Sequence, residues 1–349
     1  MNIASLGWND FHATSFATLH GRGWQPMRVA SVNREHIAVL GEAGEWGAIL
    51  AGRLRHQAHS ARDLPVVGDW VAVRRVEASA TVEAILPRRS LFVRKAPGGG
   101  TDEQPVAANI DTAFLVSGLD GDFNPRRIER YLLLAWESGT DPVIVLNKAD
   151  LCPDLAARRA AVEAVAPGVP VVALSALHVE SRSTLVRWCG AGRTVVLLGS
   201  SGVGKSTIAN LLLGREHQAV GAVRADDSRG RHTTTSRTLL PLSDGGLLID
   251  TPGMRELQLW AGEESLQTAF ADVEALAADC RFRDCTHTGE PGCAVQAALH
   301  DGALAADRLA SYHKLQKEIR YQKRRADPQA ERAEKARWKQ IHKAMRNNS

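Results

Sequence analysis

The sequence lacks an apolar segment of about 18 residues, the least that a membrane-spanning helix needs, so no membrane span is expected. The stretch from Met1 to Leu19 carries Asp10 and His12 and lacks the basic-then-apolar order of a signal peptide. Cysteine is scarce, since only five occur, and an odd number without secretion argues against a disulfide framework. These absences predict a protein of the reducing cytoplasm.

Length and charge set the scale of what is present. At 349 residues and 44% hydrophobic content, the chain is long enough for two or three domains with real cores. Its net charge of +4 is uneven, because 12 Lys or Arg and 4 Asp or Glu between Lys314 and Arg346 leave about −4 for the rest. A basic tail on a mildly acidic body indicates an anionic partner such as nucleic acid, although a solvated helix would look the same.

The first 100 residues predict a small β domain. Five short candidate strands separated by Gly and Pro turn signals suit a Greek-key barrel of the OB type, a fold that often holds single-stranded nucleic acid. Trp46 and Trp70 fit either the core or a stacking surface, with the core as the better assignment. The candidate strands are 27–32, 36–40, 45–50, 70–76 and 81–86, and the basic residues are Arg53, Arg55, Arg74, Arg75, Arg88, Arg89, Arg94 and Lys95.

After the Gly-rich linker at 97–100, buried strands alternate with helical stretches. Such alternation predicts a parallel sheet covered on both faces, with ligands at the carboxyl ends of its strands. The expected strands are 110–116, 142–146, 169–174, 194–198 and 246–249, and the expected helices are 126–138 and 207–213.

Residues 199–206 read G-x-x-x-x-G-K-S between a strand and a helix, the context that a phosphate-binding P-loop requires. Lys205 would reach the β and γ phosphates, and Ser206 would hold Mg²⁺. An ordinary Gly-rich turn is the alternative, and the flanking elements argue against it. The predicted phosphate-binding residues are Gly199, Ser200, Ser201, Gly202, Val203, Gly204, Lys205, Ser206 and Thr207.

The tetrapeptide Asn147-Lys148-Ala149-Asp150 follows the strand 142–146 and suits guanine. A carboxylate accepts a pair of hydrogen bonds from guanine N1–H and the 2-amino group, a donor pair that adenine lacks. The Asn amide can reach O6 and N7, and the Lys stem packs on the ring. Ser175 and Ala176, after the strand 169–174, offer a backbone N–H to O6 as a contextual signal only.

Two further segments complete a GTPase set. In Gly230–Ser236 a threonine would complete Mg²⁺ coordination; the pattern leaves Thr233, Thr234 and Thr235 open, and Thr234 is our choice. In Asp250–Gly253, Asp250 would contact Mg²⁺ through water and the Gly253 N–H would contact the γ phosphate.

Met254 stands near where many GTPases carry a Gln that orients the attacking water. Met cannot position water, so we assign that role to His232, with a plain solvated His as the alternative. Because the guanine motif precedes the P-loop, the set is circularly permuted. The segment Asp250–Gly253 then leads directly into the C-terminal part, which gives a nucleotide-dependent shift a short path there.

The pattern C-x4-C-x-H-x5-C over residues 280–293 suits tetrahedral Zn²⁺. Three thiolates and one imidazole leave no open position, so the site would be structural; redox or incidental cysteines are the alternative. A helix is expected over 304–321. The expected ligands are Cys280, Cys285, His287 and Cys293.

Together these motifs resemble the RsgA/YjeQ family of ribosome-associated GTPases over nearly the whole chain. The resemblance rests on the permuted order of the motifs, the G-R-H-T-T-T segment, Val67–Val71 (V-G-D-W-V) and the cysteine cluster. It implies an OB-fold RNA-binding domain over 1–100, a circularly permuted GTPase domain over 101–260, and a mostly helical zinc-binding domain with a basic C-terminal helix over 261–349.

The resemblance also implies a role in late maturation of the 30S ribosomal subunit, with contacts to 16S rRNA. GTP would be hydrolysed to GDP and phosphate when the subunit stimulates the reaction, with Mg²⁺ on the nucleotide, one structural zinc, and the His232 side chain in place of the missing Gln. We expect a cytoplasmic monomer without a membrane partner. Two other readings stay open: a P-loop kinase or ATPase, which the N-K-A-D motif opposes, and an RNA-binding module whose nucleotide site acts only as a switch.

Overall fold

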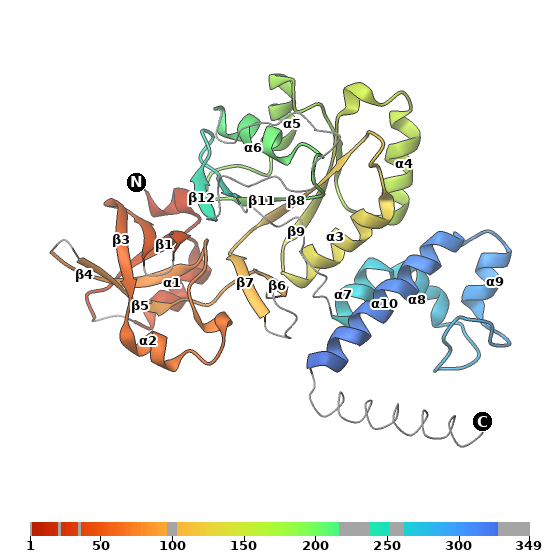
Figure 1. Ribbon diagram of the computed structural model, residues 1–349, viewed down its shortest axis with the longest axis horizontal. Helices are drawn as coiled ribbons and strands as arrows, with labels where there is room; N and C mark the ends of the chain where they lie inside the picture. Colours follow the sequence, from red (N-terminus) through yellow and green to blue (C-terminus); the bar gives the residue numbers. More distant parts are fainter. Residues whose placement is uncertain are drawn as a thin grey trace, which may run out of the picture. The chain divides into compact units, whose positions relative to one another are not determined.

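The computed structural model describes residues 2–19, 22–33, 36–77, 79–95, 103–215, 237–250 and 262–326. The chain forms two compact units, one of residues 1–94 and 103–258 and the other of 95–102 and 259–349. The first unit contains a β-barrel and an α/β sheet, and the second is helical (Figure 1). The sequence divides the chain into three domains, and its boundaries at 100 and 260 stay a prediction. No helix among the described residues is both long and apolar enough to cross a membrane.

Five strands close the predicted barrel in the order β1-β2-β3-β5-β4, with β4 pairing back onto β1. Alternate residues point inward, so that Val29, Val39, Val71 and Val82 meet in one apolar core. Trp70 is fully buried, as its core assignment requires. The strands are β1 (Gln25–Val32), β2 (Ile37–Gly41), β3 (Gly44–Leu50), β4 (Trp70–Val76) and β5 (Ser79–Ile85), with α1 (Asp10–Ala17), α2 (Gly52–Gln57) and the 3₁₀ turns η1 (Ile3–Leu6) and η2 (Ala61–Asp63) outside them.

The α/β sheet has the order β10-β9-β8-β11-β13-β12, in which the first five strands are parallel and β12 is antiparallel. Helices α3 and α4 pack together on one face, and α5 and α6 lie on the other (Figure 1). Phe114 and Val116 contribute to a buried cluster with Ile208 and Leu212 of α6. The prediction of a parallel sheet covered on both faces is therefore confirmed.

The bounds of these elements place the loops that matter below. The strands are β8 (Thr112–Gly118), β9 (Asp141–Asn147), β10 (Val171–Ala173), β11 (Thr194–Leu198), β12 (Thr238–Pro241) and β13 (Leu247–Asp250). The helices are α3 (Pro125–Glu137), α4 (Leu155–Val165), α5 (Arg182–Val186) and α6 (Lys205–Leu213), with the 3₁₀ turns η3 (Ala149–Leu151) and η4 (Val179–Ser181). A separate two-stranded sheet pairs β6 (Leu91–Lys95) with β7 (Glu103–Ala108).

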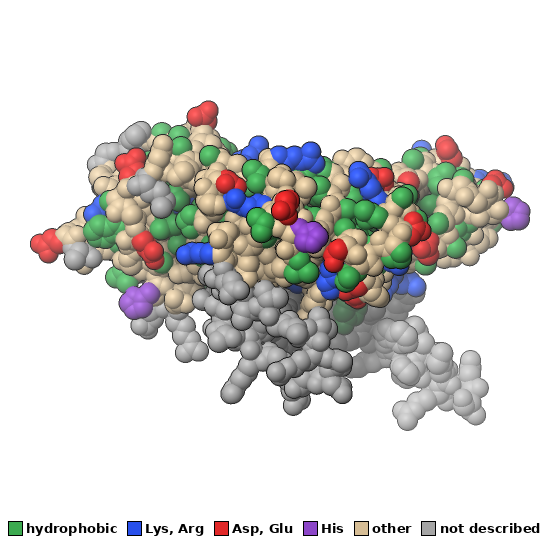
Figure 2. All heavy atoms as spheres, turned by 90° about the horizontal axis from the view of Figure 1, so that it is seen from above, with side chains coloured by type: hydrophobic (Ala, Val, Ile, Leu, Met, Phe, Trp, Pro, Cys, Tyr) green, Lys and Arg blue, Asp and Glu red, His purple; other side chains and the backbone are tan. Residues whose placement is uncertain are grey.

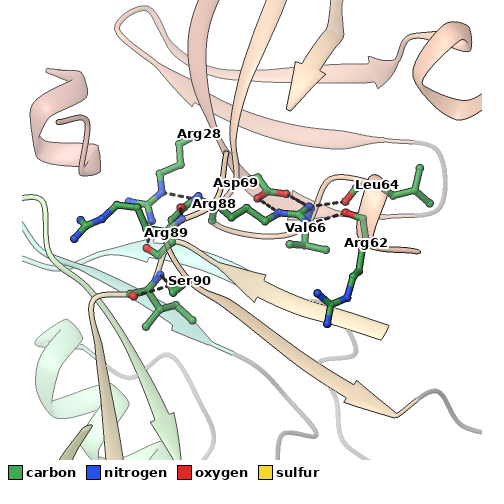
Figure 3. A network of polar contacts seen from close by, with 11 residues as sticks. Arg28, Arg62, Leu64, Val66, Asp69, Arg88, Arg89 and Ser90 are labelled. Carbon is green, nitrogen blue, oxygen red and sulfur yellow. Dashed lines mark hydrogen bonds and ion pairs between the residues drawn. The ribbon is translucent and has the colours of Figure 1, made fainter. Parts of the chain in front are cut away.

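A buried polar network joins the barrel to the start of the α/β sheet (Figure 3). The Arg28 guanidinium of β1 donates to the carbonyls of Gly68 (3.2 Å), Asn109 (2.8 Å) and Leu6. Beside it, Arg88 holds the fully buried Asp69 carboxylate through two hydrogen bonds of 2.7 Å. In addition, Ser31 of β1 pairs with Thr238 of β12, so the barrel and the α/β sheet share one continuous sheet.

The second unit consists of α7 (Glu263–Ala269), α8 (Ala271–Ala277), α9 (Ala294–His300) and α10 (Ala306–Ala326). Its core is organised by Arg308 of α10, which is 4% exposed and lies 4.1 Å from the centre of the Phe270 ring. The same guanidinium donates to both carboxylate oxygens of Asp272, at 2.7 and 3.0 Å. The loop between α8 and α9 carries the predicted zinc ligands.

Candidate nucleotide and metal sites

Four parallel strands end at the same edge of the α/β sheet, which we call the carboxyl edge. Gly118 at the end of β8 lies beside Asn147 at the end of β9. On the other side of β8, β11 ends at Leu198 directly before the P-loop, and β13 beside it ends at Asp250. The fold therefore brings the N-K-A-D segment, the P-loop and Asp250 to one edge, although they are far apart in the sequence.

One buried side chain ties three of the predicted loops together. Asn147, 3% exposed, donates from Nδ2 to the Val203 carbonyl in the P-loop at 2.8 Å. Its Oδ1 accepts from the Ala176 N–H at 3.0 Å, so the Ser175–Ala176 segment is held against it. An amide nitrogen has two N–H groups, and Val203 is the one acceptor that the described residues provide for them, so the second N–H is a candidate donor to a ligand. The predicted guanine end and phosphate end of the site are thus physically coupled.

Two P-loop glycines are required by their surroundings. A Cβ on Gly199 (φ +153°) would lie 2.4 Å from the Val116 carbonyl oxygen, and a Cβ on Gly204 (φ +97°) would lie 2.2 Å from Asn147 Nδ2. Only glycine allows such close packing together with these backbone angles. Helix α6 begins immediately afterwards at Lys205, so its first N–H groups and positive dipole end face the loop.

The Lys205 ammonium lies across the loop that it closes. Its Nζ donates to the carbonyls of Gly199, at 2.7 Å, and Ser200. Ser206 and Thr207 occupy the first turn of α6, next to the predicted phosphate position. A phosphate group in the loop would offer this ammonium anionic acceptors in place of two neutral carbonyls, and charge-assisted bonds are the stronger ones.

Lys148 has a partner that the sequence analysis missed. Its backbone is left-handed (φ 65°), and its Nζ forms a 2.5 Å ion pair with Asp120 on the loop after β8. This hydrogen bond lowers the pKa of Asp120 below its ordinary value. The signal was present in the sequence, because Gly118-Leu-Asp120 follows a buried strand that ends at the carboxyl edge. The pair fixes the Lys148 side chain against the loop after β8.

A second missed contact reaches the P-loop from α3. Arg127 donates to the Ser200 hydroxyl at 2.6 Å and forms an ion pair with Asp122. That carboxylate raises the pKa of Arg127 above its ordinary value. No motif marked Arg127, because its role depends on packing α3 beside the loop.

The pKa of Asp150 is lowered, chiefly through the hydroxyl of neighbouring Ser175.

Several predicted site residues lie outside the described residues. These are His232, Thr233, Thr234, Thr235, Gly253 and Met254. The assignments of the water-orienting His232, the magnesium-binding Thr234 and the phosphate-contacting Gly253 therefore stay predictions.

The cysteine cluster of the second unit has the dimensions of a zinc site. One ligand atom from each of the four residues Cys280, Cys285, His287 and Cys293 lies within 4.8 Å of all the others. The sulfurs of Cys280 and Cys293 are 3.8 Å apart, and each lies 3.6 Å from His287 Nδ1. Tetrahedral Zn²⁺ with Zn–S of about 2.3 Å and Zn–N of about 2.0 Å requires edges of about 3.8 and 3.6 Å. The donor set therefore fits one zinc ion.

The backbone around this cluster is held by neighbouring polar groups. Gln296 donates through its side chain to the His287 carbonyl, and its backbone N–H contacts the Cys293 sulfur at 3.4 Å. Glu290 accepts from the Thr286 hydroxyl and from the N–H groups of Thr286 at 2.8 Å and Thr288 at 2.9 Å, and these bonds keep the pKa of its carboxyl far below the usual range. Such supporting contacts fix the direction of the ligands.

Comparison with known proteins gives one consistent result. The family model described as RsgA GTPase matches residues 85–260. The "Small ribosomal subunit biogenesis GTPase RsgA" of Opitutus terrae is 50% identical, over 99% of this chain and 97% of that protein. Its namesake from Syntrophotalea carbinolica is 45% identical, over 98% and 96%.

Solved structures agree with these sequence matches. The crystal structure of YjeQ from Thermotoga maritima has a TM-score of 0.65 and 27% identity, covering 85% of this chain and 98% of that one. The structure of YloQ, titled a circularly permuted GTPase, has a TM-score of 0.60 and 26% identity, covering 86% and 96%. The permuted strand order, the loops that meet at the carboxyl edge and these matches lead to one conclusion: the chain belongs to the RsgA family of GTPases.

Proposed function

We propose that this GTPase acts in late maturation of the 30S ribosomal subunit, where it binds 16S rRNA and hydrolyses GTP when the subunit stimulates it. The observation that carries the nucleotide assignment is the Asn147 amide, which joins the N-K-A-D segment, the P-loop and Ala176. The partner is supported by the names of the relatives, which are called small ribosomal subunit biogenesis GTPases. By the same proposal the protein is a cytoplasmic monomer.

In this proposal the guanine base lies over the Lys148 stem, which the Asp120 ion pair holds in place. The exposed Asp150 carboxylate, which is ionised at neutral pH, accepts from N1–H and the 2-amino group. The second N–H of Asn147 Nδ2 is the donor assigned to the base edge, because the Ala176 N–H donates to Asn147 Oδ1. An adenine would leave Asp150 without its pair of donors, which is the source of selectivity.

The triphosphate is assigned to the loop 199–206. Lys205 would turn from its two carbonyls to the β and γ phosphates, and Ser206 would hold magnesium, with Asp250 contacting the ion through water. When bound, magnesium would supply positive charge that balances the charge developing on the transferred phosphoryl group. Thr234 as a further magnesium ligand, Gly253 as a γ-phosphate contact and His232 as the water-orienting group complete the proposal. Zinc, held by three cysteines and His287, stabilises the second unit and takes no part in the reaction.

The rRNA contacts are assigned mainly to the barrel. Basic and acidic side chains are intermixed on the face shown in Figure 2. Arg55 on α2 is exposed, whereas Arg74 pairs with Glu83 at 2.7 Å. Arg88 has a different task, because it neutralises the buried Asp69.

The test is GTP turnover measured while purified small subunits are titrated into the reaction at several salt concentrations. We expect turnover to rise with subunit concentration and the effect to weaken as salt increases, since phosphate contacts are salt-sensitive. Turnover that ignores the subunits would overturn the proposed function. Displacement of bound nucleotide by ADP as readily as by GDP would instead favour a P-loop kinase or ATPase.

A further inference from the structure

A cavity lies at the edge of the α/β sheet opposite the carboxyl edge. This cavity of about 500 Å³ lies where β8, β9 and β10 begin, and its lining includes Thr112 and Asp141 at the first positions of two of these strands. Because these strands are parallel, their first residues and their last residues lie at opposite edges. We call this cavity the edge pocket. Its volume lies in the range of small-molecule sites.

Two tryptophans form much of its wall. Trp136 comes from the C-terminal turn of α3, and Trp188 follows α5. Trp188 packs against the buried Phe114 ring in a T-shaped contact, with the ring centroids 6.1 Å apart and the ring planes at 87°. No aromatic ring or cation among the described residues stacks on the half-buried Trp136 indole, although the indole lines the cavity. The pocket therefore offers an aromatic surface that the described part of the chain does not use.

The rim carries more positive than negative charge. The Arg187 guanidinium lies 3.8 Å from the centre of the Trp188 ring, so the two groups form one flat cationic stack. Arg193 is exposed, and its contact with Asp111 is long at 4.0 Å. Asp141 is the one carboxylate among the described residues that line the cavity. This balance favours an anionic occupant over a cationic one.

We propose that the edge pocket binds a nucleotide of single-stranded RNA, with its base against Trp136 and the Arg187–Trp188 stack. Arg193 and Arg187 take the flanking phosphates. Single-stranded nucleic acid is held in this way, since every base has a flat face that stacks on aromatic rings or guanidinium groups while cations contact the backbone. The choice of RNA rests on the proposed function, whereas the pocket itself does not. A proline-rich peptide would also fit against indoles but would bring no anionic group to the Arg187 and Arg193 guanidinium groups.

The test uses the full chain and a fluorescent ten-nucleotide oligouridine, with affinity measured by anisotropy at several salt concentrations. Trp136→Ala should weaken binding roughly tenfold, because the ring on which the base stacks is lost. Trp136→Phe should retain most of the binding, because a phenyl ring can still stack on the base. Arg193→Gln should reduce the salt dependence of the affinity by about one phosphate contact. Arg55→Gln on the exposed face of α2 reports the separate contribution of the barrel.

Binding of a fluorescent GDP analogue by each variant checks that the fold is intact. Oligonucleotides carrying 4-thiouridine should cross-link to peptides containing Trp136 or Trp188. Unchanged affinity in both Trp136→Ala and Arg193→Gln, or cross-links confined to other peptides, would overturn the proposal. Trp136-dependent binding of a proline-rich decapeptide without binding of the oligouridine would also overturn it. Co-sedimentation of the parent protein with small subunits is measured separately. If the protein does not bind the subunits, the oligouridine experiment still tests whether the edge pocket binds single-stranded RNA.

Discussion

At the residue scale, the site depends on a few positions where no other side chain fits. Gly204 is one, since its backbone angle and its proximity to Asn147 Nδ2 both exclude a Cβ. The P-loop motif predicts that Gly204 must be glycine. The neighbour that makes it necessary is Asn147, which ends β9 more than 50 residues earlier in the sequence. The reason for the requirement was therefore visible only in the structure.

Gly204→Ala should weaken binding of a fluorescent GDP analogue at least tenfold, because the new methyl group would push Asn147 out of its bridging position. The matched control is Gly214→Ala, which also has a positive φ (+66°) but meets only Ser243 Oγ at 4.0 Å. That control should cost about 1 kcal/mol of stability and leave nucleotide affinity unchanged. Equal affinity in the two variants would refute the role of the Asn147 bridge.

Asp120→Asn tests the support of Lys148. Removing the carboxylate frees the Lys148 stem, so we expect the affinity for GDP to fall about threefold, by roughly 0.6 kcal/mol, in the range of a partly exposed ion pair. Glu163→Gln, which breaks the exposed Arg159–Glu163 pair on α4, is the control and should not alter affinity. Titration calorimetry with GDP distinguishes the two; no change in Asp120→Asn would show that Lys148 needs no partner.

His12 gives the fold a pH dependence. Burial, with Arg28 and Arg89 nearby, lowers the pKa of this imidazole from 6.5 to about 4, so the folded state keeps it neutral. The unfolded chain binds the proton more readily, so the stability contributed by neutral His12 is full above pH 6.5 and is lost as pH falls towards 4. His12→Gln should flatten the decline of the thermal midpoint between pH 7 and 4.5 relative to the parent. Parallel curves for the two proteins would contradict this.

At the scale of elements, sequence periodicity predicted most of the sheet but not its edges. The strand 110–116 was found because Phe114 and its neighbours form a continuous apolar run, and β8 spans Thr112–Gly118. Strand β12, the last strand of the α/β part, where it joins β1 of the barrel, was missed, because Leu239-Leu240 is short and Pro241 interrupts it. Likewise β10 is shorter than predicted and starts at Val171, just after Pro170, a residue without an N–H to pair.

Partnerships between elements were the least predictable part. Arg28 lies in a strand whose sequence is typical of an ordinary barrel strand. The residue is nevertheless 1% exposed, and its guanidinium donates to the carbonyl of Asn109, directly after β7. A buried arginine in an apolar pattern carries no signal of its partners, which are backbone carbonyls. The candidate site was predicted better, since its residues belong to short contiguous motifs.

Arg28→Ala should destabilise the first unit by roughly 3 kcal/mol or more, at about 1 to 3 kcal/mol for each buried carbonyl left without a donor. The affected acceptors belong to Leu6, Gly68 and Asn109. The control, Arg55→Ala on the exposed face of α2, should change stability by about 0.5 kcal/mol or less. Urea unfolding followed by tryptophan fluorescence gives both values; similar midpoints would disprove the bridging role.

At the scale of the whole molecule, two units with separate cores should respond separately to metal removal. Chelation, or Cys285→Ser, should unfold the second unit and leave GDP binding by the first unit within about twofold of the parent. Zinc content by mass spectrometry, together with protease cleavage between 262 and 326, measures the first effect. Full retention of structure in the metal-free protein would show that the cluster does not need its ion.

The continuity of β1 with β12 has a mechanical consequence. Strand β12 is hydrogen-bonded on one side to β13, which ends at Asp250, and on the other side to the barrel. A sliding or rotation of β12 must therefore either turn the barrel with it or break the Ser31–Thr238 bridge. The hydrogen-bonded backbone itself thus forms a direct route along which strain at the carboxyl edge reaches the barrel.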